Sequence, residues 1–475
     1  MAQLQRKLGL WTSVSIVVGT VIGSSIYMKP ATMAGQLGSP LLLLLVWIVA
    51  GVVSLFGGMI NAEVGCVLPE TGGQYVYFRH MYGNFFAYLY GWASFIVINS
   101  ASIAGISFVF AEYSAYFFPL PRFPAAVEQS IPLVIPGIGR FYLLENIGVK
   151  GLAIGLILAF TWMNTRSVKI SGMVQVFLSV LKVAALILLV GAIFFSGKGD
   201  FLNLTRGSAG FDHSFWSVFP AFIAATTGAL AAYDGWNNLG FVAGEIRDPQ
   251  KNIPRGLMIG IGLCILLYVF TTEAYLYVLP IDVMKNSTLL ASDALFKVLG
   301  VAGAGFAAFL VVISTAGSTN GNIMPCARVI YAMGEEKNFF SFTGKVNAKH
   351  QTPANALWLQ AIWSSLLVLI GSFDMLMDMF VFITWIYYGF GAYGIFILRK
   401  KMPLAERPYK LRGYPYLPVI FILFAVIYVV VTLYNDTSAY LSGRTHIINS
   451  LFGLLLTAIG IPLYGYFKKR GPSGG

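Results

Sequence analysis

Two apolar stretches of this chain contain small and polar residues at the point where a membrane helix is normally most regular. The first, residues 18–30 (VGTVIGSSIYMKP), has two glycines and two serines near its middle. The second, residues 226–238 (TTGALAAYDGWNN), has an aspartate, a glycine and two asparagines. Glycine weakens a helix, and backbone groups freed inside a membrane are tolerated only where they line a cavity or are buried in protein. Both stretches therefore predict helices that are interrupted at a site.

Interrupted helices offer two kinds of backbone group to a ligand. The N-terminus of a half-helix presents free N–H groups and partial positive charge, which attract a carboxylate. The C-terminus presents free carbonyls, which attract an ammonium group. An α-amino acid carries both charges close together and fits such a pair of ends. A broken helix could equally bind a cation or line a pore.

The individual residues of these stretches also have structural explanations. Gly19 or Gly23 taken alone is more typical of close helix packing, and it is the pair of breaks that favours a site. Asp234 is equally consistent with an N-cap for the second half of its helix and with ligand contact. Trp236 is more typical of packing than of ligand contact.

Lys182 lies well inside another apolar run. A lysine at mid-membrane depth costs about 2.5–3.5 kcal/mol unless it is paired or hydrated. Its depth disfavours snorkelling to the membrane surface. We expect its ammonium to be paired; if it lies near the broken helices, a fixed positive charge could replace a bound metal cation and remove the need for sodium.

The composition is that of a protein embedded in a membrane. Hydrophobic residues make up 57% of the 475 residues and charged residues only 11%, too few for the surface of a soluble protein of this size. Apolar runs of about 20 residues, enough to cross a bilayer core of roughly 30 Å, recur along the chain. The expected spans are residues 9–29, 39–62, 83–117, 148–164, 170–196, 215–243, 255–279, 298–327, 353–372, 374–398, 415–434 and 447–467.

The distribution of charge and the position of the breaks predict the topology. A cytoplasmic N-terminus places 21 Lys and Arg residues inside and 8 outside, which predicts that both termini are cytoplasmic. The broken spans, the first and the sixth, each begin a set of five. Because five is odd, the second set enters from the opposite face, as in an inverted repeat whose broken helices meet at the membrane midplane.

The predicted fold is therefore an all-α, multi-pass protein of the cell membrane with twelve transmembrane helices, the first and sixth of them discontinuous. Residues 1–196 and 197–402 are expected to form a five-plus-five inverted repeat. Residues 403–475 are expected to add the last two spans and a cytoplasmic tail.

Other classes of protein fit the sequence less well. The net charge of +12 is dispersed in short clusters between apolar runs, which orient spans rather than bind nucleic acid. The sequence has four histidines and no HExxH or G-x-S-x-G motif, so it has few of the residues that enzymes use for catalysis. Cys66, Cys264 and Cys326 form no readable disulfide framework or metal cluster, so no metal or cofactor is expected. A channel should have repeated polar faces, whereas the polarity here is concentrated in two breaks.

Several motifs in the same order resemble a known family. They are Gly19–Tyr27, Ala62–Gly65, Pro69–Tyr75, Tyr233–Asn237, Glu245–Arg255, Asn320-Gly321, Arg328 and Tyr331–Met333. The first of them is similar to the first-span signature of the amino acid–polyamine–organocation transporters. Within that superfamily the chain looks most like the L-type amino acid transporter branch and its bacterial serine/threonine exchanger relatives. The resemblance implies a sodium-independent amino acid exchanger with the five-plus-five fold.

The resemblance also implies roles for particular residues. The substrate carboxylate would lie on backbone N–H groups around Gly23, Ser24 and Ser25, and the amino group on carbonyls near Val21, Ala231 and Asp234. Lys182 matches a lysine that joins span one to span eight, where its partners would lie around Ser314, Thr315 and Ser318.

Two positions depart from the family pattern. Ser25 stands where a glycine is usual, and its Cβ narrows the approach of the carboxylate while its hydroxyl adds a donor. Ala231 stands where many relatives have a bulky aromatic residue, which implies a roomier pocket or a gate formed elsewhere, by Tyr233 or Trp236. Both departures bear on the choice of substrate.

Further expectations concern partners and energetics. In the animal L-type relatives a cysteine between spans three and four bonds to an ancillary subunit; residues 118–147 contain no cysteine, so no disulfide-linked partner is expected. Glu63, Glu112 and Glu273 lie near span ends and are expected at the membrane interface, with proton coupling as an open role. A proton-coupled symporter, a uniporter and, more remotely, a channel or receptor are the alternatives to an exchanger.

Overall fold

Long apolar helices dominate the structure, a computed structural model that describes residues 8–68, 73–166, 168–209, 211–212, 214–347 and 349–470. Within these residues nine helices are long and apolar enough to cross a membrane, and a bent pair of shorter helices makes a tenth. The prediction of a multi-pass helical membrane protein is thus confirmed.

The helices that correspond to the expected spans are, in chain order, α1 (Leu10–Val21) with α2 (Ser25–Leu37), α3 (Pro40–Val67), α5 (Asn84–Ala93) continued by the π-helical turn η1 (Ser94–Asn99) and α6 (Ser100–Ser114), α8 (Ile147–Arg166), α9 (Val168–Phe195), α10 (Phe215–Tyr233) with the 3₁₀ helix η3 (Trp236–Glu245), α11 (Pro249–Val278), α13 (Leu290–Glu335), α14 (Ala354–Ile370), α15 (Phe373–Lys401), α16 (Tyr416–Leu441), and α17 (Asn449–Ala458) with α18 (Gly460–Arg470). The connecting elements are α4 (Gln74–Tyr82), α7 (Ala125–Glu128), β1 (Pro132–Ile135), β2 (Gly139–Tyr142), η2 (Phe201–Leu204), α12 (Ile281–Met284) and η4 (Ser341–Gly344).

Two features depart from the predicted elements. α13 is much longer than the expected span 298–327 and bends at Gly300, whose φ of 67° is one that glycine adopts freely. The loop at 118–147 contains β1 and β2, which pair antiparallel with Leu133 opposite Phe141. Gly137 and Gly139, both at positive φ, make the tight turn between them. The all-α prediction was therefore wrong for this small hairpin.

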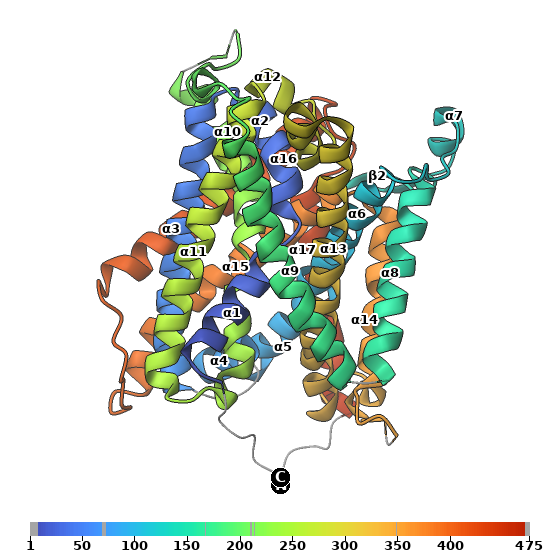
Figure 1. Cartoon of the computed structure of the whole chain (residues 1–475). Helices are drawn as coiled ribbons and strands as arrows, with labels where there is room; N and C mark the ends of the chain where they lie inside the picture. The colour runs from blue at the N-terminus through green and yellow to red at the C-terminus, as the bar shows by residue number, and fades with distance from the viewer. Residues whose placement is uncertain are drawn as a thin grey trace.

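The two bent spans lie inside the bundle. α1 packs against α11 and η3, and α2 packs against α10. Around them the longer helices run side by side, α3 with α11 at one edge and α8 with α14 at the other (Figure 1). The interruptions at the two breaks are therefore surrounded by protein, which is the condition under which non-helical backbone is tolerated in a membrane.

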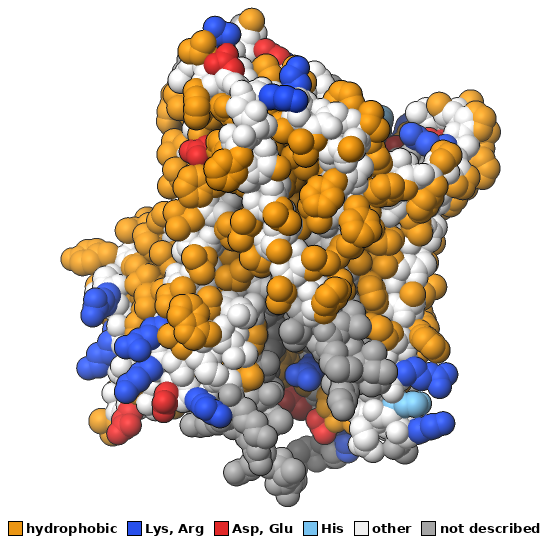
Figure 2. All heavy atoms as spheres, viewed as in Figure 1, with side chains coloured by type: hydrophobic (Ala, Val, Ile, Leu, Met, Phe, Trp, Pro, Cys, Tyr) orange, Lys and Arg blue, Asp and Glu red, His pale blue; other side chains and the backbone are white. Residues whose placement is uncertain are grey.

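The surface has the pattern expected of a chain that crosses a bilayer. Figure 2 shows hydrophobic side chains covering the middle of the molecule, with Lys and Arg gathered toward its two ends. Large apolar side chains of the apolar helices are exposed, among them Ile187 (54%), Trp216 (85%) and Val430 (60%). In water such a surface would promote aggregation, whereas in a membrane lipid tails can cover it.

The prediction that Glu63 lies exposed at the membrane interface was wrong. Its side chain is 1% exposed and accepts two hydrogen bonds from Arg399, at 2.8 and 2.7 Å. The backbone N–H of Leu411 donates a third, at 2.7 Å. The carboxylate links α3 to the end of α15 and to the loop that follows, so Glu63 has a structural role. Glu112 and Glu273 are half-buried.

Candidate functional site

The first break separates α1 from α2. α1 ends at Val21, and α2 begins at Ser25 with its axis turned by 48°. Ile22, between them, has an extended ψ of 98°. The carbonyls from Gly19 onward therefore lose their partners within the helix and need other donors.

The second break separates α10 from η3. α10 ends at Tyr233, and Asp234 is extended with a ψ of 153°. Gly235 follows with a φ of 113°, a conformation that residues with a Cβ rarely adopt. Both helices are thus interrupted where the composition predicted.

The two breaks touch each other. The Thr20 hydroxyl lies within hydrogen-bonding distance of the Gly235 carbonyl, at 2.9 Å, as well as of carbonyls in its own helix. A Cβ built on Gly235 would lie 2.7 Å from the Thr20 carbonyl oxygen. Residue 235 must therefore be glycine both for its backbone conformation and for this close approach.

Tyr268 of α11 joins the two breaks from one side. Its hydroxyl lies 2.9 Å from the carbonyl oxygen of Val21 and 3.0 Å from that of Ala232, the last turns of α1 and α10. The ring is fully buried and packs against Trp47 and Tyr233. One hydroxyl has one proton, so it can donate to only one of these carbonyls at a time.

Lys182 of α9 approaches the first break from another side. Its ammonium is 1% exposed and donates to the Gly19 carbonyl and, at 3.4 Å, to the Ser318 hydroxyl of α13. The structure therefore places this lysine between spans one and eight. Of the other suggested partners, Thr315 bonds to carbonyls of its own helix, and the Ser314 hydroxyl has no hydrogen-bond partner among the described residues.

The N-terminal end of α2 is closed in this structure. Ser24 and Ser25 are 1% and 4% exposed. The Ser24 hydroxyl has no hydrogen-bond partner among the described residues and caps no N–H group. Gly23 has room for a Cβ, with only the Val21 carbonyl oxygen nearby at 3.8 Å. Glycine at position 23 is thus not required by packing in this conformation.

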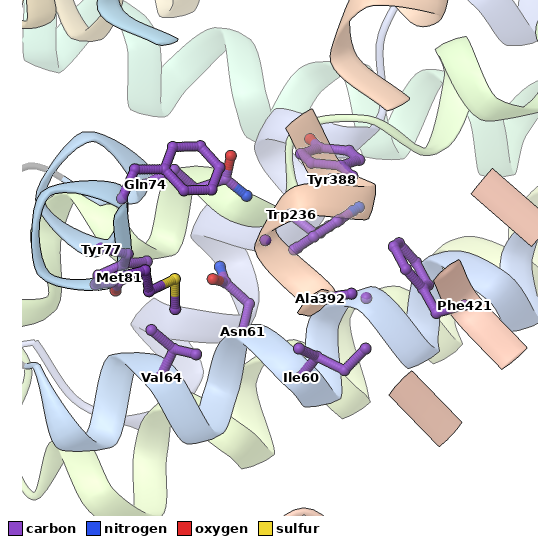
Figure 3. Close-up of a pocket in the computed structure, with 13 residues that line it drawn as sticks. Ile60, Asn61, Val64, Gln74, Tyr77, Met81, Trp236, Tyr388, Ala392 and Phe421 are labelled. Atoms are coloured by element: carbon purple, nitrogen blue, oxygen red, sulfur yellow. The ribbon is translucent and has the colours of Figure 1, made fainter. Parts of the chain in front are cut away.

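A cavity of about 20 Å³ lies beside the start of η3, where the second break ends. Trp236 lines it and packs on Tyr388, with ring centres 4.9 Å apart. Figure 3 shows Asn61 and Gln74 around the same hollow. The Trp236 side chain therefore lines a cavity and also packs against Tyr388.

Asp234 was predicted either to cap the second half of its helix or to contact the ligand. It ends α10 rather than capping η3, and its carboxylate accepts a hydrogen bond of 2.5 Å from the Tyr388 hydroxyl. It also lines a second cavity, of about 30 Å³. Tyr233 and Ala231 line neither cavity: the Tyr233 ring is packed between Trp47 and Tyr268, and Ala231 is half-buried.

Sequence reasoning missed a second buried lysine. Lys29 of α2 is 3% exposed and forms ion pairs with Asp374 at 2.7 Å and Asp378 at 3.3 Å, both on α15. The expected first span stopped at residue 29, so this lysine looked like an end residue. α2 continues to Leu37, which puts the charge inside the helix. Of the motif residues, 69–72 lie outside the described part of the chain.

Together these elements define a membrane protein whose two interrupted helices meet around buried polar groups, which is an arrangement used by carriers of small molecules. Residues 8–457 match the model of the amino acid permease family, and the chain belongs to that family.

Curated relatives extend over most of the chain. The b(0,+)-type amino acid transporter 1 of Mus musculus is 29% identical over 439 residues, 91% of this chain and 84% of its own length. The serine/threonine exchanger SteT of Bacillus subtilis is 28% identical over 478 residues, 98% of both chains. The cystine/glutamate transporter of Homo sapiens is 28% identical over 466 residues, 98% of this chain and 86% of its own. The protein is therefore an amino acid transporter and not an enzyme.

Ser25 provides a test of the proposed carboxylate contacts. Ser25→Gly should keep substrate affinity within about threefold, because backbone N–H groups would still hold the carboxylate. Ser25→Leu should reduce binding by at least tenfold, because a large side chain would fill the space at the start of α2. Binding is measured by isothermal titration of the purified protein. Equal affinities for the Leu variant and the natural protein would place the carboxylate elsewhere.

Proposed function

We propose that this protein is a sodium-independent exchanger of neutral L-amino acids that works by alternating access. The observation that carries the proposal is the position of Lys182, whose ammonium donates to a carbonyl freed at the first break. A fixed positive charge there fills the electrostatic role that a bound sodium ion would otherwise have. The name of one relative, a serine/threonine exchanger, supports exchange of small neutral amino acids.

The substrate would bridge the two breaks. Its carboxylate would lie on the N–H groups of Gly23, Ser24 and Ser25 at the start of α2, where a helix N-terminus attracts an anion. Its ammonium would lie on the carbonyls at the end of α1 and α10, near Val21 and residues 231–234. Those carbonyls are within reach of the Tyr268 hydroxyl in the present conformation, so binding would require it to release at least one of them.

The proposal includes the membrane topology. We propose twelve spans in the cell membrane, both termini in the cytoplasm and a five-plus-five inverted repeat formed by residues 1–196 and 197–402. Nine long helices and the bent pair α1–α2 overlap ten of these spans, and the apolar helices Val180–Phe195 and Ala354–Ile370 fall within the fifth and the ninth. All three cysteines of the chain are buried, which supports function without a disulfide-linked subunit.

Exchange is tested by counterflow in proteoliposomes. Vesicles preloaded with each of a panel of neutral amino acids should take up the same labelled amino acid, in sodium or choline medium alike. Empty vesicles should take up little. A strict sodium requirement would contradict the proposal.

The same vesicles separate exchange from its nearest rivals. Uptake into empty vesicles that follows an imposed pH gradient would indicate a proton-coupled symporter. Uptake into empty vesicles without any gradient would indicate a uniporter. Either result would keep amino acid transport and overturn exchange.

A further inference from the structure

A cavity of about 540 Å³ lies apart from the two breaks, and no residue of either break lines it. Small-molecule sites have volumes of roughly 300–1,000 Å³. The wall is formed by α2, α6, α8, α15 and the segments 115–122 and 285–289, the second of which directly follows α12. α2 and α12 lie at the end of the molecule opposite α4 (Figure 1). In the proposed topology this end faces outward, and we call this space the outer cavity.

α2 connects the outer cavity to the first break. This helix begins at Ser25, beside the break, and its residues Met28, Ala31 and Thr32 line the cavity. An amino acid that arrives from outside the cell would therefore meet this wall before it reaches the proposed site between the breaks.

The positive charges in the wall of the outer cavity already have partners. Arg122 pairs with Glu128 at 3.6 Å, and Lys285 pairs with Asp282 at 2.6 Å. Neither of these two carboxylates lines the cavity itself. The basic side chains of the wall are thus neutralised from outside the cavity.

The two carboxylates of the wall, Glu112 and Asp374, have fewer partners. The Glu112 oxygen Oε2 is buried and has no hydrogen-bond partner among the described residues. Asp374 accepts from the Lys29 ammonium at 2.7 Å, but Lys29 also pairs with Asp378 at 3.3 Å. One positive charge is therefore shared by two aspartates, and Glu112 adds a further negative charge.

A buried acidic oxygen without a partner is uncommon, and a cation that donates hydrogen bonds would supply what is missing. An ammonium group has three N–H donors and can serve two carboxylates at once. A metal ion fits less well, because no group of three or more His, Cys, Asp or Glu side chains is placed to hold one in the described part of the chain. The hydroxyl groups of Thr32, Ser287 and Thr288 line the same space and can bond to the rest of a polar ligand.

We infer that the outer cavity is a second amino acid site, in which Glu112 and Asp374 hold the ammonium group of a substrate that enters from outside. This inference rests on the proposed function, because the ligand is the transported amino acid and the cavity faces outward only in the proposed topology. A cleft whose free charge has one sign raises the local concentration of the opposite charge. The cavity should therefore lower the KM for substrate on the outer face and leave the KM on the cytoplasmic face unchanged.

Glu112→Gln tests the inference, because glutamine has nearly the same shape and lacks the charge. Exchange of labelled threonine is measured from the outer face in intact cells and from the cytoplasmic face in inside-out vesicles. The variant should raise the outer KM at least fivefold and keep the inner KM within twofold. KM does not depend on the amount of folded protein, so poor expression would not imitate this result.

Glu273→Gln is the matched control. Glu273 is also a half-buried acid near the end of a membrane helix, α11, but it does not line the outer cavity. Both KM values of this variant should match those of the natural protein. If Glu112→Gln keeps the outer KM, or raises the KM equally on both faces, the inference is overturned.

A competitor gives a second test that uses the natural protein. The amine 1-amino-2-propanol is threonine without its carboxylate, so it retains the group that the outer cavity would hold. It should inhibit exchange from outside at a concentration at least fivefold lower than from the cytoplasmic face. Equal or absent inhibition on the two faces would overturn the inference, whereas a natural protein that transports no amino acid would contradict the proposed function itself.

Discussion

Lys182→Ala should reduce the rate of exchange at least tenfold while the protein stays folded. The variant removes the ammonium that donates to the Gly19 carbonyl and contacts Ser318. A charge-assisted hydrogen bond is worth about 1.5–3 kcal/mol, and about 1.4 kcal/mol changes an equilibrium tenfold. Losing it would shift the balance between inward-open and outward-open states. Lys182→Arg should not restore transport, because its planar guanidinium has a different shape from the compact ammonium.

The chain offers a matched control for this variant. Lys150 is also a buried lysine, 3% exposed, whose ammonium donates to the carbonyls of Tyr142 in β2 and Leu369 in α14 at 2.9 Å each, and neither carbonyl belongs to a break. Lys150→Ala should lower the melting temperature in detergent but leave the exchange rate per folded molecule largely unchanged. A Lys182→Ala protein that exchanges at the natural rate would make this lysine a packing residue only.

Gly235→Ala should reduce both thermal stability and the rate of exchange, the latter by about tenfold. A residue with a Cβ at a φ of 113° is strained by about 1–3 kcal/mol. The new Cβ would also lie 2.7 Å from the Thr20 carbonyl oxygen, a backbone atom that cannot rotate away. The two breaks would have to separate, and the Thr20 hydroxyl would lose the Gly235 carbonyl.

A second glycine variant controls for the substitution itself. Gly262→Ala lies on α11, where no atom stands within 4 Å of an added Cβ, so it should be neutral or slightly stabilising. Melting temperature and exchange rate are measured for both variants. Normal values for Gly235→Ala would show that contact between the breaks is dispensable.

Features that depend on local composition could be predicted from the sequence. The breaks lie where glycine and polar residues interrupt apolar runs, and the same signal gave Asp234 and Trp236. The depth of Lys182 in its run predicted a paired charge. Each of these properties is readable within about twenty residues of chain, the length of one membrane span.

Features that depend on distant partners could not be predicted in the same way. Tyr268 looks like any aromatic residue of an apolar helix, and only the fold brings its hydroxyl to the Val21 carbonyl, 247 positions away. Lys29 and Glu63 lie near the expected ends of spans, and their partners on α15 are more than 300 positions distant. The second cavity, beside Asp234, is lined by residues of α4, α5, η1, α6, η3, α13 and α15, so no single stretch of sequence reveals it.

The central claim is that one amino acid bridges the two breaks, with its carboxylate at one kind of helix end and its ammonium at the other. A structure of the protein with threonine bound tests it most directly. The account predicts the carboxylate on the N–H groups of residues 23–25 and the ammonium at the carbonyl ends of α1 and α10. Threonine bound away from both breaks would contradict it.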